Sequence, residues 1–420
     1  MGSKSELSRK KEDVLAVLNA DDSGAWERVG GIPLVARSLF HLKKLGIKKV
    51  ILLLRTDHLP EDLRRWQAGL ELRVLKAGQD LPATILSIPD RGEYFFYIDA
   101  AHLIDPRLLR ALLNVSKTTL LCMDSSDAEK EVIRAGFLRR EDLQTWSSQG
   151  KGPMIRRSVS LLPGDIDSFS PEIRGPLPPY FMEVRSKKNA TEATGVVIRS
   201  QQKQVMDLPA QFIDPPFENA LTRFLCTTPV TPNMVTLSGV IVAVGTAWLF
   251  WHGNFLGGAL CAFVVEILDG VDGKLARTRL RFTTLGHYED VIDYFYENSW
   301  YVALSVGLSA VTSSYLPRIL AGLLILSDTA DNVFYTLSSR WYGKSIDLFS
   351  RFDGAFRRIA GRRNIYTFIF IIGFSLGFPL QTFAFVAVWA ALTAALHGLR
   401  LFQYGRTDKK ISPQEEEADA

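Results

Sequence analysis

Residues 268–293 read LDGVDGKLARTRLRFTTLGHYEDVID, a stretch that places five acidic and four basic residues between long apolar segments. A charged side chain at the centre of a membrane helix costs roughly 2.5–3.5 kcal/mol. Four unpartnered aspartates would therefore cost on the order of 10 kcal/mol, which is comparable with the stability of a whole domain. These four are Asp269, Asp272, Asp290 and Asp293. They must lie near an interface, be paired, or bind cations.

The flanking segments indicate an integral protein of the cell membrane. Six apolar segments of about 20 residues, the length that crosses a bilayer, occupy 234–252, 255–276, 287–309, 315–337, 364–380 and 382–402. The N-terminus is polar and unlike a signal peptide. Lys and Arg cluster in 276–281, 340–363 and 400–410 but are absent from 252–254, 310–314 and 379–382. This asymmetry predicts that both termini are cytoplasmic.

The spacing of the acidic residues favours cation binding over simple pairing. Asp269, Asp272, Gly273 and Ala276 fall on one stripe of the second span. Asp290 and Asp293 form a matching pair three residues apart at the start of the third span. A loop of about ten residues lets the two spans face each other, so the carboxylates could converge on Mg²⁺ or Mn²⁺. Such an ion beside small residues and basic side chains suits a pyrophosphate.

At these positions the sequence resembles the CDP-alcohol phosphotransferases, over about residues 210–405. Their motif is DxxDGxxAR, eight residues, G, three residues, D, three residues, D. It is matched by Asp269, Asp272, Gly273, Ala276, Arg277, Gly286 and Asp290, and TPNMVT at 231–236 matches the usual lead-in. The last aspartate is expected at 294, where Tyr294 stands, and the carboxylate falls at Asp293. Alternatively, Glu289 and Asp293 keep the four-residue step.

The resemblance implies a metal-dependent transfer and a homodimer. Asp269, Asp272 and Asp290, or Glu289 in its place, would hold one or two divalent ions, with Asp293 as the fourth acid. Asp293, beside Asp290, would be the catalytic group that takes a proton from the acceptor hydroxyl. The hydroxyl attacks the phosphorus nearer the alcohol, and CMP leaves. The implied CDP-binding residues are Asn233, Thr236, Asp269, Gly273, Ala276, Arg277 and Gly286, and Arg277 would stabilise phosphate charge.

Further charged residues are candidates for binding the acceptor. They are Lys274, Asp328, Asp331, Arg357, Arg358 and Arg362. The two aspartates repeat the three-residue spacing, which is equally typical of a solvated helix face. The arginines are either a positive-inside signal or, if the acceptor carries a phosphate, the groups that bind it. Glu266 is either a site residue or a partner of an arginine.

The N-terminal part, residues 1–205, predicts a soluble α/β domain. Strand-like runs at 14–20, 50–54 and 94–99 alternate with helical spacing, and Asp105 with Pro106 begins a helix. GIPL at 31–34 and GIKKVILLL at 46–54 resemble sugar-phosphate nucleotidyltransferases, whose metal-binding aspartate would fall on Asp99. The loop ADDSGAWERVGG at 20–31 lacks their glycine-rich, basic phosphate cradle. We interpret this domain as catalytically silent.

The complete prediction is a polytopic α-helical membrane protein with six transmembrane helices and an N-terminal α/β nucleotidyltransferase-like domain. A helix at 189–204 capped by Asn189 ends the head, 206–233 is a linker with an interfacial amphipathic helix, 234–405 is the membrane domain, and 406–420 is a disordered tail. Three scattered cysteines give no disulfide framework. The net charge of +4 is explained by the basic loops, so no nucleic-acid partner is expected.

The donor is expected to be a CDP-alcohol of the CDP-diacylglycerol or CDP-inositol type, and the acceptor an alcohol or phospho-alcohol. The two-part layout resembles the bifunctional inositol-1-phosphate cytidylyltransferase and di-myo-inositol-phosphate phosphate synthases. Because the chain has only 22% charged residues and lacks a hyperthermophile's Lys/Glu excess, we favour phospholipid synthesis. The alternatives are an inositol-phosphate synthase, a cation-coupled transporter and a non-catalytic scaffold.

Overall fold

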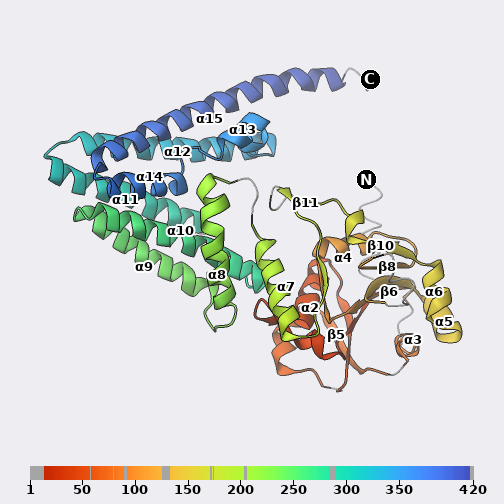
Figure 1. Ribbon diagram of the computed structural model, residues 1–420. Coiled ribbons are helices and arrows are strands. Elements are labelled where there is room, and N and C mark those ends of the chain that lie inside the picture. Colours follow the sequence, from red (N-terminus) through yellow and green to blue (C-terminus); the bar gives the residue numbers. More distant parts are fainter. Residues whose placement is uncertain are drawn as a thin grey trace. The chain divides into compact units, whose positions relative to one another are not determined.

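The computed structural model describes residues 14–56, 58–78, 80–88, 92–124, 133–170, 173, 175–202, 206–282 and 289–416. The chain forms two compact units (Figure 1). One comprises Met1–Ser200 with Thr278–Leu280, and the other Gln201–Arg277 with Arg281–Ala420. We call them the head and the helical unit.

A seven-stranded sheet organises the head, in the order β10-β8-β9-β6-β1-β4-β5. Its strands are β1 (Leu15–Asn19), β4 (Lys49–Leu54), β5 (Glu71–Lys76), β6 (Tyr94–Asp99), β8 (Thr119–Leu121), β9 (Ala135–Arg139) and β10 (Val159–Leu161). β1 pairs in parallel with both β4 and β6, whereas β9 runs antiparallel to β6 and β8. Both faces of β1 are buried, which explains its continuous apolar run.

Helices cover both faces of this sheet (Figure 1). They are α2 (Leu34–Lys44), α3 (Leu81–Leu86), α4 (Pro106–Leu113), α5 (Arg140–Gln149) and α6 (Lys151–Arg157), with α7 (Lys187–Arg199) ending the head. The 3₁₀ turns are η1 (Ser23–Trp26), η2 (Glu61–Trp66) and η4 (Pro163–Asp165). Three small antiparallel pairs join β2 (Arg28–Val29) to β3 (Ile32–Pro33), β7 (His102–Ile104) to β13 (Phe181–Glu183), and β11 (Phe169–Ser170) to β12 (Gly175–Pro176).

Local signals in the head predicted most of these boundaries. The strand that was expected to end at Asp99 does so, and Asp105 caps α4 by accepting a hydrogen bond from the Arg107 N–H at 2.9 Å. The predicted start of α7 was wrong. Ser186 is extended and its hydroxyl accepts the N–H of Asn189 at 3.2 Å, so the helix begins before Asn189. It also ends at Arg199 and not at 204.

The helical unit contains six long helices where six membrane spans were expected. They are α9 (Pro232–Trp251), α10 (Phe255–Thr278), α11 (Glu289–Thr312), α12 (Leu316–Tyr342), α14 (Arg363–Ser375) and α15 (Pro379–Glu416). A π-helical turn η5 (Pro209–Ile213), the helix α8 (Asp214–Leu225), the turn η7 (Ile346–Leu348) and α13 (Arg351–Phe356) complete it. Past residue 406, where a tail was expected, α15 continues to Glu416.

Two helices among the described residues are long and apolar enough to cross a membrane. They are Pro232–Trp251 and the segment Pro379–Arg406 of α15. The other four carry several charged residues or, like α14 with 13 residues, rise only about 20 Å. That rise is less than the hydrocarbon thickness of about 30 Å. The six spans therefore remain a prediction.

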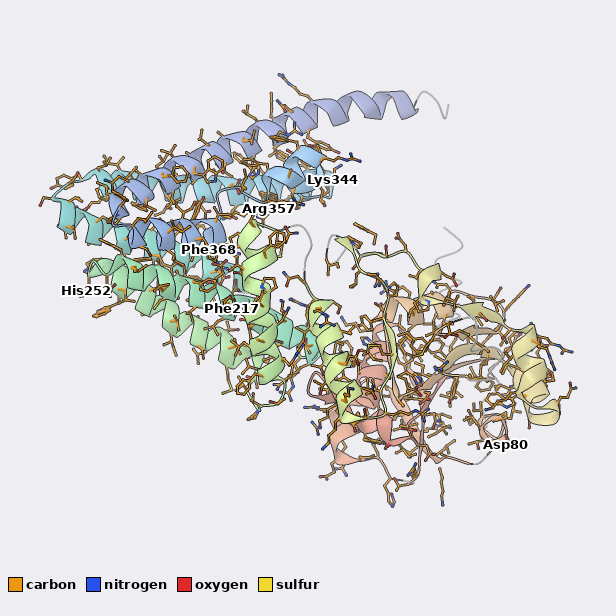
Figure 2. All side chains as sticks on the ribbon, in the orientation of Figure 1. Asp80, Phe217, His252, Lys344, Arg357 and Phe368 are labelled. Carbon is orange, nitrogen blue, oxygen red and sulfur yellow. The ribbon has the colours of Figure 1, made fainter. Side chains whose placement is uncertain are left out.

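Aromatic side chains form the core of the helical unit. Trp300 and Tyr301 of α11 lie in one buried cluster with Tyr366 and Phe370 of α14. The Trp300 indole also donates to the carbonyl of Ala243 at 2.9 Å, which joins α11 to α9. Figure 2 labels Phe217 on α8 and Phe368 on α14, whose rings both contact Phe263 of α10. These contacts hold α8, α10 and α14 together around the acidic stretch.

Candidate functional site

Two acidic residues of the opening motif project from α10 towards α9 and α11. Asp269 and Asp272 both line a small cavity with Thr236 of α9. Asp272 is buried, and its carboxylate accepts a hydrogen bond from the Thr236 hydroxyl at 2.6 Å. A hydroxyl donor from the neighbouring helix therefore fixes the orientation of one predicted ligand.

Glycine within the motif lets another helix approach. A side chain at Gly270 would place its Cβ 1.9 Å from a carboxylate oxygen of Glu218 on α8. Gly273 and Ala276 are half-buried, whereas Arg277 is exposed. Asn233 in the first turn of α9 is also half-buried. The residues expected to bind CDP thus lie along the ends of α9 and α10, except Gly286, which is outside the described residues.

On α11, the acidic residue that lines this cavity is Asp293, one position before the aspartate expected at 294. Asp293 and Tyr296 line the cavity. The Tyr294 hydroxyl instead shares a hydrogen bond with Thr329 of α12 at 2.8 Å. Position 294 therefore faces α12, whereas Asp293 faces α10. The side chains of Glu289 and Asp290 lie outside the described residues.

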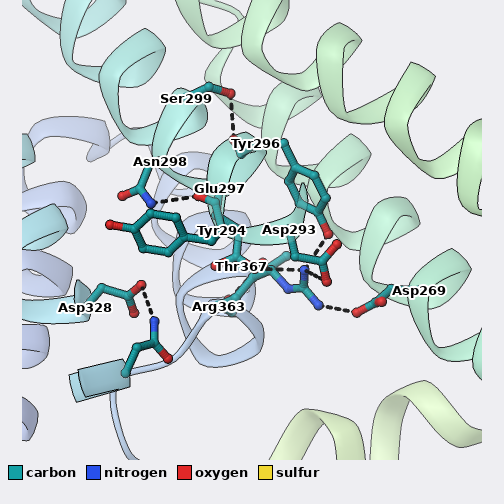
Figure 3. A network of polar contacts seen from close by, with 11 residues as sticks. Asp269, Asp293, Tyr294, Tyr296, Glu297, Asn298, Ser299, Asp328, Arg363 and Thr367 are labelled. Atoms are coloured by element: carbon teal, nitrogen blue, oxygen red, sulfur yellow. Dashed lines mark hydrogen bonds and ion pairs between the residues drawn. The ribbon is translucent and has the colours of Figure 1, made fainter. Parts of the chain in front are cut away.

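A single arginine joins the acidic residues of α10 and α11 (Figure 3). Arg363, the first residue of α14, donates from Nη2 to the carboxylate of Asp269. Its Nη1 lies 3.5 Å from Asp293, 2.8 Å from Glu297 and 2.6 Å from the Tyr296 hydroxyl. The prediction from the sequence did not identify Tyr296 and Glu297. Glu297 follows Asp293 by four residues, and this helical spacing is the signal that could have revealed it.

The cavity between these helices has the size of one small ion or water. Its volume is about 20 Å³ and its polar lining is Thr236, Asp269, Asp272, Asp293 and Tyr296. Carboxylate and hydroxyl oxygens are the donors that Mg²⁺ and Mn²⁺ prefer, so the chemistry of the site fits such an ion. Among the described residues, no three His, Cys, Asp or Glu side chains lie close enough together to coordinate a metal ion in this structure.

Lys274, a candidate for the acceptor, makes contacts inside the helical unit. Its ammonium nitrogen lies 2.7 Å from Glu218, 2.6 Å from Gln202 and 2.8 Å from Asn219. These three oxygens match the three donors of an ammonium group. Burial raises the pKa of Glu218, although the charge of Lys274 opposes this shift. Lys274 thus attaches α10 to α8.

The remaining acceptor candidates gather around α12 and the segment before α14. The Asp331 carboxylate lies 2.5 Å from Nδ1 of His397, and the Arg362 guanidinium lies 4.4 Å above the Tyr335 ring. Asn332 donates to Asp328 at 3.4 Å. Arg357, labelled in Figure 2, lies 3.3 Å from Asp207, and the Arg358 carbonyl accepts the N–H of Leu208. Asp328 and Arg363 also appear together in Figure 3.

Asp214, a buried acid on α8, interacts with other acidic side chains of the helical unit. Asp214 is 1% exposed. Burial raises the pKa of Asp214, and the charges of Glu218 and Asp207 raise it further. Glu266 itself is buried on α10, three residues before Asp269. Neither carboxylate oxygen of Glu266 makes a hydrogen bond among the described residues, so both interpretations of Glu266, pairing with an arginine or membership of the site, stay predictions.

In the head, Asp99 ends β6 among polar side chains. One of its oxygens accepts the N–H of Ala101 at 3.1 Å, and the other lies 3.4 Å from His102. On its other side, His102 lies 3.9 Å from Glu183, which pairs with Arg185. The position agrees with the rule that ligands of open α/β sheets bind at the carboxyl ends of the strands.

Comparisons with known proteins identify the C-terminal half. Residues 229–400 match the family model described as CDP-alcohol phosphatidyltransferase. A bifunctional IPC transferase and DIPP synthase from Rubrobacter xylanophilus is 30% identical over 159 residues, which are 37% of this chain. The match covers 33% of that protein, so the chain spans about a third of the length of this curated relative.

Two solved structures illustrate what the chain is similar to. The phosphatidylinositol phosphate synthase of Mycobacterium tuberculosis, solved with CDP-DAG bound, has 18% identity and a TM-score of 0.34, covering 45% of this chain and 94% of that one. A 4-diphosphocytidyl-2C-methyl-D-erythritol synthase from Anaerococcus prevotii has 12% identity and a TM-score of 0.32, covering 44% and 97%. Residues 229–400 of this chain are thus similar to the CDP-alcohol phosphatidyltransferase family, and the curated relative is named as a transferase and synthase.

Proposed function

We propose that this protein transfers a phospho-alcohol group from a CDP-alcohol to an acceptor hydroxyl and releases CMP. The observation that carries the proposal is the cavity between α9, α10 and α11, where Asp269, Asp272 and Asp293 meet inside the family domain. Three carboxylates that line one small cavity repel one another, and Arg363 is a cationic group that contacts two of them, Asp269 and Asp293. A dication there would offset this repulsion.

The carboxylates of Asp269, Asp272 and Asp293, with Glu289 or Asp290, would hold Mg²⁺ or Mn²⁺. A bound divalent ion supplies charge stabilisation for the pyrophosphate of the donor. The Thr236 hydroxyl orients Asp272. Asp293 takes the proton of the acceptor hydroxyl, and the exposed Arg277 binds phosphate oxygens. Gly273 and Ala276 line the cytidine pocket, and Asn233 and Gly286 are further candidates for binding CDP.

The location of the reaction follows from the two apolar helices, α9 and the first part of α15. We propose an integral membrane protein of the cell membrane with cytoplasmic termini, working as a homodimer in phospholipid synthesis from CDP-diacylglycerol. The name of the curated relative favours a second candidate, in which the donor is a CDP-inositol and the product an inositol phosphate diester. With either donor, the head binds a ligand or partner and catalyses no reaction of its own.

The direct test is CMP release by the purified protein in detergent with Mg²⁺ or Mn²⁺. Wild-type protein is compared across CDP-diacylglycerol and CDP-inositol, each with a panel of alcohols and phospho-alcohols. We expect release with one donor class, and a loss of about a hundredfold or more in Asp269→Asn and Asp293→Asn, in line with the removal of a catalytic acid or base. Asp167→Asn in the head serves as the control and should release CMP like the wild type.

The same assay decides whether Glu289 or Asp290 is the remaining acidic ligand. If Asp290 holds the ion, Asp290→Asn loses activity and Glu289→Gln keeps it, and the reverse pattern would identify Glu289. The absence of CMP release with every donor would contradict the proposed reaction. Cation flux in liposomes without CMP release would support a transporter in its place.

A further inference from the structure

The guanidinium of Arg363 lies between the carboxylates that the proposed function assigns to a cation. It contacts Asp269 on one side and lies near Asp293 and Glu297 on the other. The three carboxylates that line the cavity, those of Asp269, Asp272 and Asp293, carry a net charge of −2 together with Arg363, which one divalent ion would neutralise. Charge balance therefore allows a cation and Arg363 to be present together.

The partners of Arg363 fall into two sets. Asp269 and Asp293 line the cavity of about 20 Å³, whereas Glu297 does not. Glu297 makes the shorter ion pair, 2.8 Å against 3.5 Å for Asp293, and the Tyr296 hydroxyl accepts at 2.6 Å. Arg363 thus pairs with two carboxylates that a cation in the cavity would bind and with one, Glu297, that lies outside the cavity.

Glu297 is the partner of Arg363 that lies outside the cavity. It is half-buried in the middle of α11, four residues after Asp293, while Tyr294 is turned to Thr329 on α12. A half-buried carboxylate in an apolar helix needs a partner, and Arg363 is the basic residue that contacts it. The arginine on α14 is therefore held from α11 independently of the cavity.

We infer that Arg363 is a positioning residue that takes the place of the divalent cation between Asp269 and Asp293, and that Glu297 keeps its guanidinium beside the site when the cation binds. The inference rests on the cation site of the proposed function. Before binding, Arg363 holds carboxylates from two helices together. On binding, the cation must break the contacts of Arg363 with Asp269 and Asp293, so Arg363 lowers the cation affinity of the site.

The test is a titration of the purified protein with Mn²⁺ alone, followed by electron paramagnetic resonance and without any CDP-alcohol. We expect Arg363→Gln to bind Mn²⁺ about tenfold more tightly than the wild type, a change of about 1.4 kcal/mol. Arg363→Lys keeps the charge and should stay within about threefold of the wild type, and it covers the case in which the glutamine variant does not fold. Arg340→Gln is the control, because it removes one positive charge from an exposed position of α12.

A double-mutant cycle tests the role of Glu297. Glu297→Gln should weaken Mn²⁺ binding in the Arg363 background, because the arginine then pairs more closely with Asp269 and Asp293. In the Arg363→Gln background the same substitution should have little effect. Equal effects in both backgrounds would mean that Glu297 acts on the cation without Arg363, which overturns the inference.

Unchanged or weaker Mn²⁺ binding in Arg363→Gln, or no Mn²⁺ binding by the wild type, would also overturn it. CMP release is measured separately on the same preparations. A tighter Mn²⁺ site together with absent CMP release in the wild type would leave the inference standing and reject the proposed reaction.

Discussion

At the scale of single residues, the Thr236 hydroxyl is the contact that connects α9 to the acidic motif. It donates to Asp272 at 2.6 Å. A hydrogen bond to a charged group contributes about 1.5–3 kcal/mol. Without it, Asp272 would keep its charge but lose its fixed orientation towards the cavity.

Thr236→Val removes the hydroxyl and preserves the shape of the side chain. We expect CMP release to fall by about ten- to a hundredfold, equivalent to about 1.4–2.8 kcal/mol, with little change in the thermal midpoint. Ser238→Ala is the control, since that exposed hydroxyl donates only to the Met234 carbonyl. Equal activity of Thr236→Val and wild type would show that Asp272 needs no orientation from α9.

The acidic residues could be predicted from the sequence because their spacing is local, but their basic partner could not. Asp269 and Asp272 are three residues apart, and a helix brings such positions together whatever the tertiary structure. Arg363 is 94 positions from Asp269 and 70 from Asp293. Its place between them depends on how α14 packs against α10 and α11, which no spacing rule provides.

At the scale of helices, the attachment of α8 to α10 depends on a charge pair and a missing side chain. Glu218 on α8 pairs with Lys274 at 2.7 Å, and both side chains are at most 10% exposed. Gly270 leaves the room that Glu218 occupies. Breaking a buried pair by removing one partner leaves a buried charge and typically costs about 3–5 kcal/mol.

Glu218→Gln therefore should lower the thermal midpoint of the protein in detergent by several degrees. The double variant Glu218→Gln with Lys274→Met removes both charges and should recover part of the loss. A single variant as stable as the wild type would mean that Gln202 and Asn219 suffice to stabilise the Lys274 ammonium.

A second pair joins α13 to α15 and makes the stability depend on pH. Asp353 is 2% exposed and accepts from Arg400 at 2.6 and 2.7 Å and from the Ser350 hydroxyl at 2.6 Å. Burial alone would raise the pKa of Asp353, but the hydrogen bonds from Arg400 and Ser350 outweigh it, so the pKa is lowered. Its stabilisation is therefore present above the unfolded pKa of about 3.9 and lost as the pH falls through the lowered folded value.

Asp353→Asn should be less stable than the wild type at pH 7, by about 3 kcal/mol if the Arg400 charge is left without a partner. The difference should shrink as the pH falls below about 4, where the unfolded wild-type chain binds a proton at Asp353 while the folded state resists protonation. Thermal unfolding in detergent at pH 7, 5 and 3.5 measures this. A difference that does not depend on pH would show that shape, and not charge, holds α13 to α15.

Helix and strand positions were predictable to the extent that their signals are local. Asp105 and Pro106 mark the start of α4 by capping chemistry alone. At α7, both Ser186 and Asn189 can cap a helix, and only the extended backbone at Ser186 settles which one does. The contacts of Lys274 with Gln202 and Asn219 could not be foreseen, because they depend on the packing of segments 72 and 55 positions away.

At the scale of the whole molecule, the charged residues that make the site also obscure the membrane topology. α10, α11 and α12 carry the acids of the site, so they fail a test of length and apolarity that α9 and Pro379–Arg406 pass. The loops still differ in charge, since Lys and Arg cluster in 340–363 and are absent from 252–254 and 310–314. Under the positive-inside rule this asymmetry predicts that both termini are cytoplasmic, if all six helices cross.

Cysteine labelling in intact cells tests this orientation. The native Cys122, Cys226 and Cys261 are first replaced by alanine. His252 and Arg340 are exposed, and Tyr315 is 76% exposed, so a cysteine at each is accessible to reagent. We expect His252→Cys and Tyr315→Cys to react with a membrane-impermeant maleimide from outside, and Arg340→Cys to react only after permeabilisation.

The reverse pattern would place the acidic site on the outer side, where no CDP-alcohol is made, and would contradict the proposed reaction. Reaction of all three from one side would show that α12, which lies between positions 315 and 340, does not cross the membrane.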